Sequence, residues 1–100
     1  MYTIIWEYLI EEDRTREFEA MYGPRGTWAQ LFAKHPGFVE TVLLCDPVRP
    51  QRYATIDRWR QESDFKAFLQ LWKADYERID LEAAELTKSE IRVGAFETVG

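Results

Sequence analysis

Residues 2–9 (YTIIWEYL) begin a pattern that returns at residues 51–59 (QRYATIDRW). In both places a strand-like stretch leads into a helical stretch and then into a second strand-like stretch. The helical stretches are residues 13–35 and 63–86, and the second strand-like stretches are residues 37–46 and 89–99. Two β-α-β units predict a small α+β sandwich, in which four strands form one sheet and the helices cover one of its faces. The other face is left bare and needs a partner.

The length of 100 residues fits a single domain, which we assign to residues 1–100. A chain this short buries only a modest fraction of its surface, so its core is marginal when it stands alone. Aromatic residues make up 15% of the chain, and four of them are tryptophans. This surplus indicates either an interface between subunits or a cavity lined with aromatic rings.

The charge balance argues against several kinds of partner. The net charge is −5 and no basic stripe is visible, so we expect no binding to nucleic acid or to a membrane. The first residues carry no positive leader, and no apolar run is long enough to cross a bilayer. The lone Cys45 cannot form an internal disulfide. We expect it to be a small buried residue, in a protein of the reducing cytoplasm.

The alternation of side chains defines four strands, predicted at residues 2–10, 38–45, 52–60 and 90–99. In residues 2–10 both alternating sets of side chains are largely apolar, which is typical of a strand that is buried on both faces. In residues 52–60 one side of the strand carries Tyr53, Thr55, Asp57 and Trp59.

Both helical stretches carry an apolar face at helical spacing. The first is split, because residues 23–26 (GPRG) contain glycine and proline, which end helices. This loop is either the mouth or lid of a cavity or a spacer between two helical segments. The expected N-caps are Asp13, Thr27 and Ser63. The second helix is expected to continue as one apolar stripe until Leu86.

The sequence offers few groups for metal or nucleophilic chemistry. One histidine and one cysteine cannot supply a closed zinc site, so no metal is expected. There is no phosphate-binding loop and no nucleophile elbow. His35 lies at a predicted helix C-terminus, where a partial positive charge is favoured. It is either a capping residue or a catalytic one.

The tryptophans are either plain core residues or the walls of a pocket for a flat hydrophobic ligand. Such pockets are mostly apolar and contain a few placed polar groups. Asp57 is one candidate for such a group, since it lies in the middle of a strand among apolar residues. If buried it should be paired, and Arg92 of a neighbouring strand is the expected partner.

The order strand, helix, strand, strand, helix, strand resembles that of the antibiotic biosynthesis monooxygenase superfamily of dimeric α/β barrels. The resemblance is carried by IIWEYLIEEDRTREFEAMYGPRGTWAQLFAKHPGFVETVLLCD (residues 4–46) and RYATIDRWRQESDFKAFL (residues 52–69). It includes the Pro-Gly-Phe cluster at residues 36–38, and a strand-ending Trp59 followed by a helix start at residues 63–65. The match spans nearly the whole chain.

The resemblance implies a ferredoxin-like βαββαβ fold, with a four-stranded antiparallel sheet, helices on one face, and a homodimer formed by sheet-to-sheet packing. Characterised members include cofactor-independent oxygenases that turn phenolic polyketides into quinones, so the resemblance implies that no cofactor is needed. Another branch degrades haem with an Asn, a Trp and a His, at positions that correspond to about Trp6, Phe68 and Arg78 here. The Asn, Trp and His of that branch are all replaced at these positions, so haem degradation is not expected.

The resulting hypothesis is a monooxygenase that binds a small aromatic or polyketide-type compound between the helices and the sheet. The predicted ligand-binding wall consists of Trp6, Trp28, Phe32, Phe68 and Trp72. The predicted catalytic contacts are Tyr22, Tyr76 and Asp57. Two alternatives stay open. One is a ligand-binding or stress-related dimer without chemistry, and the other is a structural dimer with a filled core.

Overall fold

A computed structural model describes residues 1–100, and its elements follow the predicted βαββαβ order with each helical half divided in two. The strands are β1 (Tyr2–Ile10), β2 (Phe38–Cys45), β3 (Arg52–Trp59) and β4 (Thr87–Glu97). The helices are α1 (Thr15–Tyr22), α2 (Thr27–Phe32), α3 (Glu62–Leu71) and α4 (Lys73–Ala83), followed by the 3-10 turn η1 (Ala84–Leu86). The prediction of a ferredoxin-like α+β fold is confirmed.

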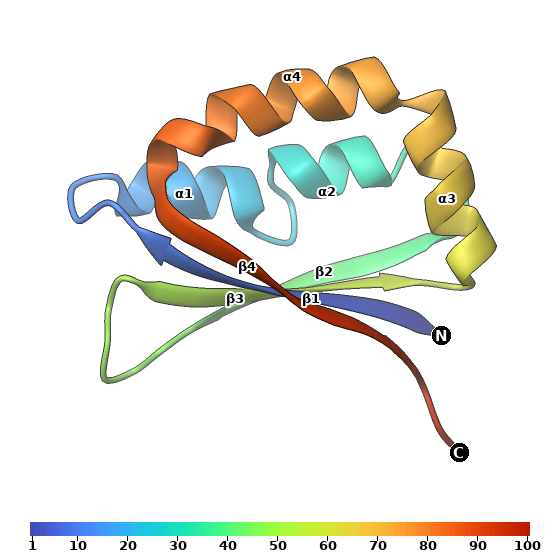
Figure 1. Cartoon of the computed structure of the whole chain (residues 1–100), viewed down its shortest axis with the longest axis horizontal. Helices are drawn as coiled ribbons and strands as arrows, with labels where there is room; N and C mark the ends of the chain where they lie inside the picture. Colours follow the sequence, from blue (N-terminus) through green and yellow to red (C-terminus); the bar gives the residue numbers. More distant parts are fainter.

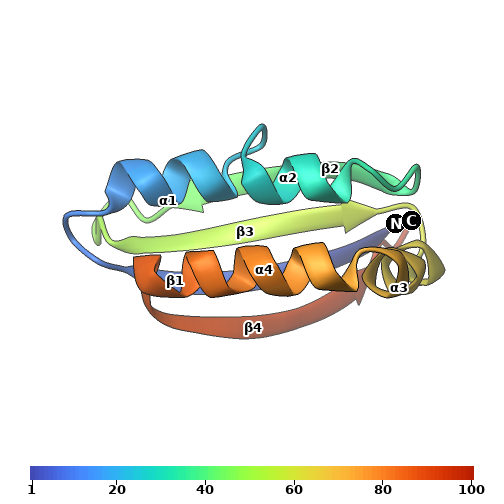
Figure 2. The same ribbon diagram turned by 90° about the horizontal axis from the view of Figure 1, so that it is seen from above.

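The four strands form one antiparallel sheet in the order β2-β3-β1-β4. All helices lie on the same face of this sheet, and α4 runs alongside the line of α1 and α2 (Figures 1 and 2). We call the helix-covered side the inner face. The register places Asp57 of β3 between Ile4 of β1 and Thr41 of β2. Directly opposed residues of neighbouring strands point to the same side, so all three belong to the inner face.

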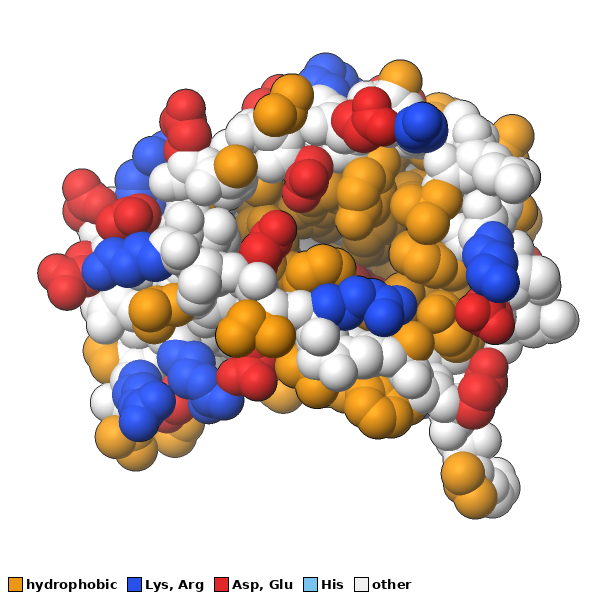
Figure 3. Space-filling model, viewed as in Figure 1, with side chains coloured by type: hydrophobic (Ala, Val, Ile, Leu, Met, Phe, Trp, Pro, Cys, Tyr) orange, Lys and Arg blue, Asp and Glu red, His pale blue; other side chains and the backbone are white.

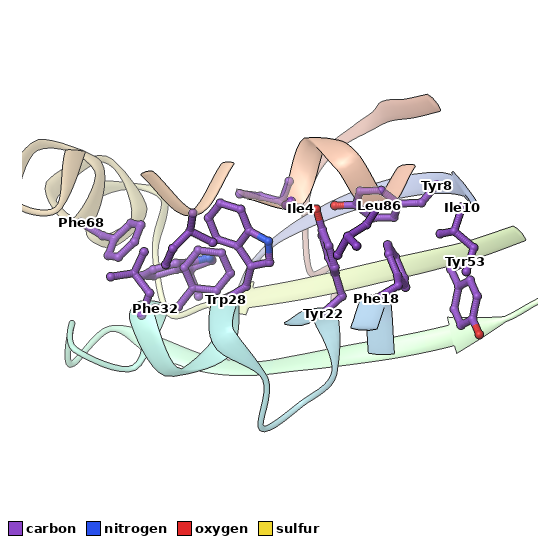
Figure 4. Packing of buried hydrophobic residues seen from close by; sticks show 14 of the residues in the cluster. Ile4, Tyr8, Ile10, Phe18, Tyr22, Trp28, Phe32, Tyr53, Phe68 and Leu86 are labelled. Atoms are coloured by element: carbon purple, nitrogen blue, oxygen red, sulfur yellow. The ribbon is translucent and has the colours of Figure 1, made fainter. Parts of the chain in front are cut away.

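The core fills the space between the inner face and the helices. Fifteen buried residues form one continuous cluster, which includes Ile4 and Ile10 from β1, Phe18 from α1 and Phe68 from α3. Trp59, at the end of β3, is the largest side chain with no exposed surface. Aromatic rings supply much of this cluster, as the sequence composition suggested, and Figure 4 shows them in a row between the two layers.

The helix starts differ from the predicted caps. Asp13 precedes the cap position of α1, which is Arg14, and Arg14 instead pairs its guanidinium with Glu17. Thr27 and Ser63 lie inside α2 and α3, and no side chain caps either helix. At α2 the cap is Gly26, where a β-carbon would lie 2.6 Å from the carbonyl oxygen of Ala20. The chain therefore folds closely over the end of α1, and this contact fixes where α2 begins.

The second helical stretch is two helices, contrary to the single helix that was predicted. The break falls at Trp72, whose backbone leaves the helical region (φ −118°, ψ 24°). α3 and α4 consequently point in different directions (Figure 1). No glycine or proline marks this break, and the helical spacing of apolar residues continues across it. The sequence pattern therefore predicted one helix. The ring of Trp72 lies under the ammonium group of Lys34, at 4.7 Å from the ring centroid.

The strand ends also shift slightly. β3 ends at Trp59 rather than Arg60, and β4 runs over Thr87–Glu97 rather than residues 90–99. β4 contains an irregularity where Ile5 pairs with Gly94 and Trp6 pairs with Arg92. Gly94 has a φ of +154°, a conformation that side-chain-bearing residues rarely adopt. This bulge lies beside the inner-face hollow described below.

The opposite side of the sheet, which we call the outer face, is not covered by any helix (Figure 1). Its apolar residues are half-buried or exposed, with Ile91 60% and Phe96 51% exposed. Cys45, at the end of the edge strand β2, is exposed, so the prediction that it is buried is wrong. None of the helices has the length and apolar character that crossing a membrane requires.

Candidate functional site

A hollow opens between the inner face and the helices, beside the packed core. Its walls come from all four strands and from α1, α2 and α4. The lining residues are Trp6, Tyr8, Tyr22, Trp28, Phe32, Thr41, Thr55, Asp57, Tyr76, Asp80 and Glu90. Figure 3 shows it as a depression below α4, with hydrophobic walls and with both acidic and basic side chains at its edge.

The hollow is narrow. The part that admits a water molecule measures about 50 Å³, and the whole space between its walls, counted out to the solvent, about 440 Å³. Pockets for drug-sized ligands measure roughly 300–1,000 Å³, so the enclosed part of the hollow is well below that size. Only a small compound that extends through the open mouth into the solvent suits it.

Asp57 is the only acid on the floor of this hollow. Its Oδ1 accepts a hydrogen bond of 2.7 Å from the Thr41 hydroxyl on β2. Burial raises the pKa of Asp57 from 3.8 to about 6, and the hydrogen bond from Thr41 offsets part of that rise. The expected ion pair with Arg92 does not form, because β4 pairs with β1 and not with β3. Arg92 lies opposite Trp6 instead.

Three tyrosines surround the hollow, and all are held in the protonated form. Burial raises the pKa of Tyr76 to about 12 and moves the pKa values of Tyr8 and Tyr22 still further upward. The negative charge of Asp57 adds to the rise for Tyr8 and Tyr76. At neutral pH these phenols therefore act as neutral hydrogen-bond donors towards whatever occupies the hollow.

Two polar atoms in the walls lack partners. Trp28 Nε1 and Thr55 Oγ1 are buried and make no hydrogen bond. Trp28 and Thr55 lie close enough to Tyr22 and Tyr8 to lower the pKa values of these phenols against the larger effect of burial, but neither pair has the geometry of a hydrogen bond. A buried polar group without a partner is costly and marks a place where a ligand atom or water is useful.

The mouth of the hollow is acidic. Asp80 on α4 and Glu90 on β4 line it, and neither carboxylate forms an ion pair with a lysine or arginine. Burial, and next the charge of Asp80, raise the pKa of Glu90. The one basic side chain whose charge reaches this region is Arg92, which lowers the pKa of Tyr76 slightly.

Six of the eight predicted site residues converge on the hollow. These are Trp6, Tyr22, Trp28, Phe32, Asp57 and Tyr76. Phe68 lies outside it, fully buried, with its ring centroid 5.3 Å from that of Trp59. Trp72 also lies outside it, at the break between α3 and α4.

Five lining residues were not predicted: Tyr8, Thr41, Thr55, Asp80 and Glu90. The alternation of β1 and β3 carried a signal for Tyr8 and Thr55, because they share a strand side with Trp6 and Asp57. No comparable signal marked Asp80 or Glu90, which look like ordinary surface acids.

The two remaining candidates lie outside the hollow. The Nδ1 atom of His35 accepts a hydrogen bond of 3.0 Å from the Gly37 backbone N–H, so this ring stabilises the turn before β2. Residues 23–26 connect two lining residues, Tyr22 and Trp28, but do not line the hollow themselves.

The family model for antibiotic biosynthesis monooxygenases matches residues 1–73. The chain belongs to this family. No curated protein sequence matches the chain.

Solved structures share the fold over nearly the whole chain. A point mutant of SnoaB, a cofactor-independent oxygenase from Streptomyces nogalater, has 24% sequence identity and a TM-score of 0.76, covering 97% of this chain and 91% of that one. A conserved protein from Methanosarcina mazei has 10% identity and a TM-score of 0.78, covering 98% and 92%. A protein from Bordetella bronchiseptica has 22% identity and a TM-score of 0.74, covering 98% and 96%. At these identities the structural likeness establishes the fold.

Proposed function

We propose that the chain is a cofactor-independent monooxygenase that oxidises a small phenolic compound in the hollow. The observation that carries this proposal is Asp57, a carboxylate with a pKa of about 6 on the floor of a hollow whose walls are largely aromatic. A group with a pKa close to working pH is suited to proton transfer. Membership of the monooxygenase family and the likeness to SnoaB support the same reaction class.

The proposed reaction takes a phenol and O₂ to a quinone and water. Asp57 accepts the proton of the phenolic hydroxyl, and the substrate gives one electron to O₂. The resulting superoxide and substrate radical combine, which forms a C–O bond on the ring. Asp57 returns its proton to the resulting peroxide. The O–O bond then breaks as the ring C–H proton leaves, so that one oxygen atom stays as the new carbonyl and the other departs as hydroxide, which takes up that second proton to give water. The substrate supplies all the electrons.

Proton transfer alone is uphill. An ordinary phenol has a pKa of about 10, so passing its proton to an acid of pKa about 6 costs about 5 kcal/mol. Hydrogen bonds from Tyr22 and Tyr76 to the developing oxyanion reduce this cost, and a narrow site with little water strengthens them. Loss of the electron to O₂ then draws the reaction forward.

The experiment is oxygen uptake with a panel of one- to three-ring phenols, in the presence of a chelator and without added flavin, haem or metal. We expect turnover whose kcat/KM rises with pH through about 6, since Asp57 must be ionised to act as a base. Replacing Asp57 by Asn should lower the rate about 100-fold or more. Ligand binding without oxygen consumption by any phenol would instead favour the non-catalytic binding protein.

We also propose that two chains pack through their outer faces, in the cytoplasm. The lone exposed Cys45 suits a reducing compartment. The outer face carries an apolar patch formed by Ile5, Leu9, Val42, Leu44, Ile56, Ile91 and Phe96. The ion pair of Arg58 with Glu40 lies at its edge, and Glu7, which stands between Ile5 and Leu9 on β1, is paired with Arg52. An exposed apolar patch on an uncovered face is typical of an interface.

The mass in solution tests the dimer. We expect a dimer by light scattering, and a monomer after Ile91→Glu together with Phe96→Glu. The matched control is Leu81→Glu, because Leu81 is 76% exposed but lies on α4, away from the outer face. A dimer that survives the double substitution would place the interface elsewhere.

A further inference from the structure

The proposed oxidation needs Asp57 and the tyrosines but gives no role to the two acids at the mouth. Asp80 on α4 and Glu90 on β4 both line the hollow, and the charge of Asp80 helps to raise the pKa of Glu90. Neither acid has a lysine or arginine partner within 4 Å, although other surface acids such as Glu17 and Glu40 do. Two neighbouring negative charges without a basic partner favour the binding of a positively charged ligand.

Behind the mouth, the walls form an aromatic cage. The ring centroids of Tyr8 and Tyr22 are 4.8 Å apart, those of Tyr22 and Trp28 6.2 Å, and those of Trp28 and Tyr76 4.9 Å. No lysine, arginine or histidine lines the hollow. Aromatic side chains pack well against a ligand ring. The walls therefore suit an aromatic ligand and carry no positive charge that would oppose a cation at the mouth.

The interior of the hollow also contains polar groups that have no hydrogen-bond partner in the protein and favour polar atoms on the ligand. Trp28 Nε1 can only donate a hydrogen bond, and it is buried without an acceptor. Thr55 Oγ1 is likewise buried and unpartnered. Asp57 receives its one hydrogen bond on Oδ1, which leaves its second oxygen free for a ligand hydroxyl. These groups fit a ligand that brings an oxygen to the inner end.

We infer that the ligand of this hollow is a phenol that also carries a protonated amine. The ring stacks in the aromatic cage, the hydroxyl points towards Asp57 and Trp28, and the amine lies between Asp80 and Glu90. This inference rests on the proposed function, because it names the substrate class for the same site. The acids are not arranged to hold a metal ion, so an organic cation is the occupant they suit. Arg92 leaves the mouth with a net negative charge, since two acids face one base.

The test compares three probes with the same ring and almost the same length. Tyramine carries an ammonium group, 4-ethylphenol is neutral, and 3-(4-hydroxyphenyl)propionate carries a carboxylate. In titration calorimetry at neutral pH and low salt, we expect tyramine to bind about tenfold more tightly than 4-ethylphenol, and the propionate to bind most weakly. Added salt should shrink the difference, because the mouth is open to solvent.

The preference should disappear when Asp80→Asn and Glu90→Gln are combined. The matched control combines Glu82→Gln and Glu97→Gln, which removes the same charge from the same two elements but away from the hollow. We expect the control to keep the tenfold preference. Thermal unfolding of both variants checks that the fold is intact.

Equal or weaker binding of tyramine, a preference that persists in the double variant, or no binding of any probe would each overturn the inference. Oxygen uptake separates this result from the proposed function. If neutral phenols are oxidised but no amine is preferred, the substrate class is wrong and the oxidation stands. If the amine is preferred but no phenol is oxidised, the hollow is a binding site for such cations and the oxidation is wrong.

Discussion

Trp59 and Asp57 lie two residues apart on the same side of β3, yet their surroundings differ completely. Trp59 has no exposed surface, and four phenylalanine rings surround it. Their centroids lie 5.2–5.6 Å from that of Trp59, and they belong to Phe32, Phe38, Phe65 and Phe68. Asp57 faces the hollow, where only the Thr41 hydroxyl binds it. Two consecutive inner-face residues of β3, Trp59 and Asp57, thus lie in a densely packed core and in a polar site respectively.

The difference shows how a small domain can keep an unfavourable group. A buried carboxylate with a raised pKa is less stable in the folded chain than in water. The ring cluster around Trp59 supplies packing that the hollow lacks, and both belong to the same sheet. Functional sites commonly lower stability, and the surrounding structure compensates. The two ends of β3 should therefore respond to substitution in opposite directions.

The largest effect is expected at the packed end. Replacing Trp59 by Ala removes the ring that contacts four others, and the cavity left behind adds to the lost burial. We expect a loss of about 3–5 kcal/mol in the free energy of unfolding, measured by denaturant titration.

Trp59→Phe is the matched control for this loss. It keeps an aromatic ring and removes the buried Nε1 atom, which has no hydrogen-bond partner. We expect this substitution to cost much less than Trp59→Ala. Equal costs for the two variants would show that ring packing is not what stabilises this end.

At the open end, Asp57→Asn should raise stability while it removes activity. The pKa of Asp57 in the folded chain, about 6, lies above the ordinary 3.8, so the folded state binds the proton more tightly. Stability therefore falls as pH rises from about 4 to about 6, and stays lower above that. The shift corresponds to roughly 3 kcal/mol, and Asn avoids it because it carries no charge.

The measurement is thermal unfolding of both proteins at pH 4 and pH 8. We expect similar stability at pH 4 and a clear gain for Asp57→Asn at pH 8. Asp46→Asn is a contrasting control. The backbone N–H groups of Val48 and Arg49 lower the pKa of Asp46, so its loss should destabilise the fold at pH 8. If the difference in stability between the two proteins is the same at pH 4 and pH 8, ionisation of Asp57 does not destabilise the fold.

The sequence predicted the architecture well because the fold depends on patterns. The alternation of β3 put Thr55, Asp57 and Trp59 on one side, and the structure confirms it. The same pattern singled out Asp57 as an acid among apolar neighbours. The alternation pattern could not predict that Trp59 is tightly packed while Asp57 faces a hollow. That difference depends on how closely α1, α2 and α4 approach the sheet at each point.

The mouth acids and the helix break were missed for a related reason. Asp80 is exposed on α4, and on the chain it looks like the other acids of that helix. Only the fold shows that Asp80 and Glu90 of β4 line the same hollow. Phe68 and Trp72 share the apolar stripe with Tyr76, so the stripe predicted all three as pocket residues. The break at Trp72 separates them, and only Tyr76 reaches the hollow.

The smallest effect is expected from Thr41, which adjusts Asp57 without reaching the ligand's reacting atoms. Its hydroxyl donates to Asp57 Oδ1 and lowers the pKa of that acid against the effect of burial. Thr41→Val keeps the shape and removes the donor, so the pKa of Asp57 should move upward by about one unit. Carboxyl carbon chemical shifts followed through a pH titration measure this directly, without any need for substrate.

The activity profile should follow the same shift, because the ionised form of Asp57 is the base. In Thr41→Val the rise of kcat/KM should lie at higher pH, while the rate at the alkaline plateau changes little. Thr41→Ser keeps the hydroxyl and should leave both the titration and the profile in place. If Val and Ser titrate alike, the Thr41 hydroxyl does not set the pKa. Burial alone would then determine the pKa of Asp57. The surroundings of Asp57 would in that case differ from those of Trp59 only in the lack of neighbouring rings.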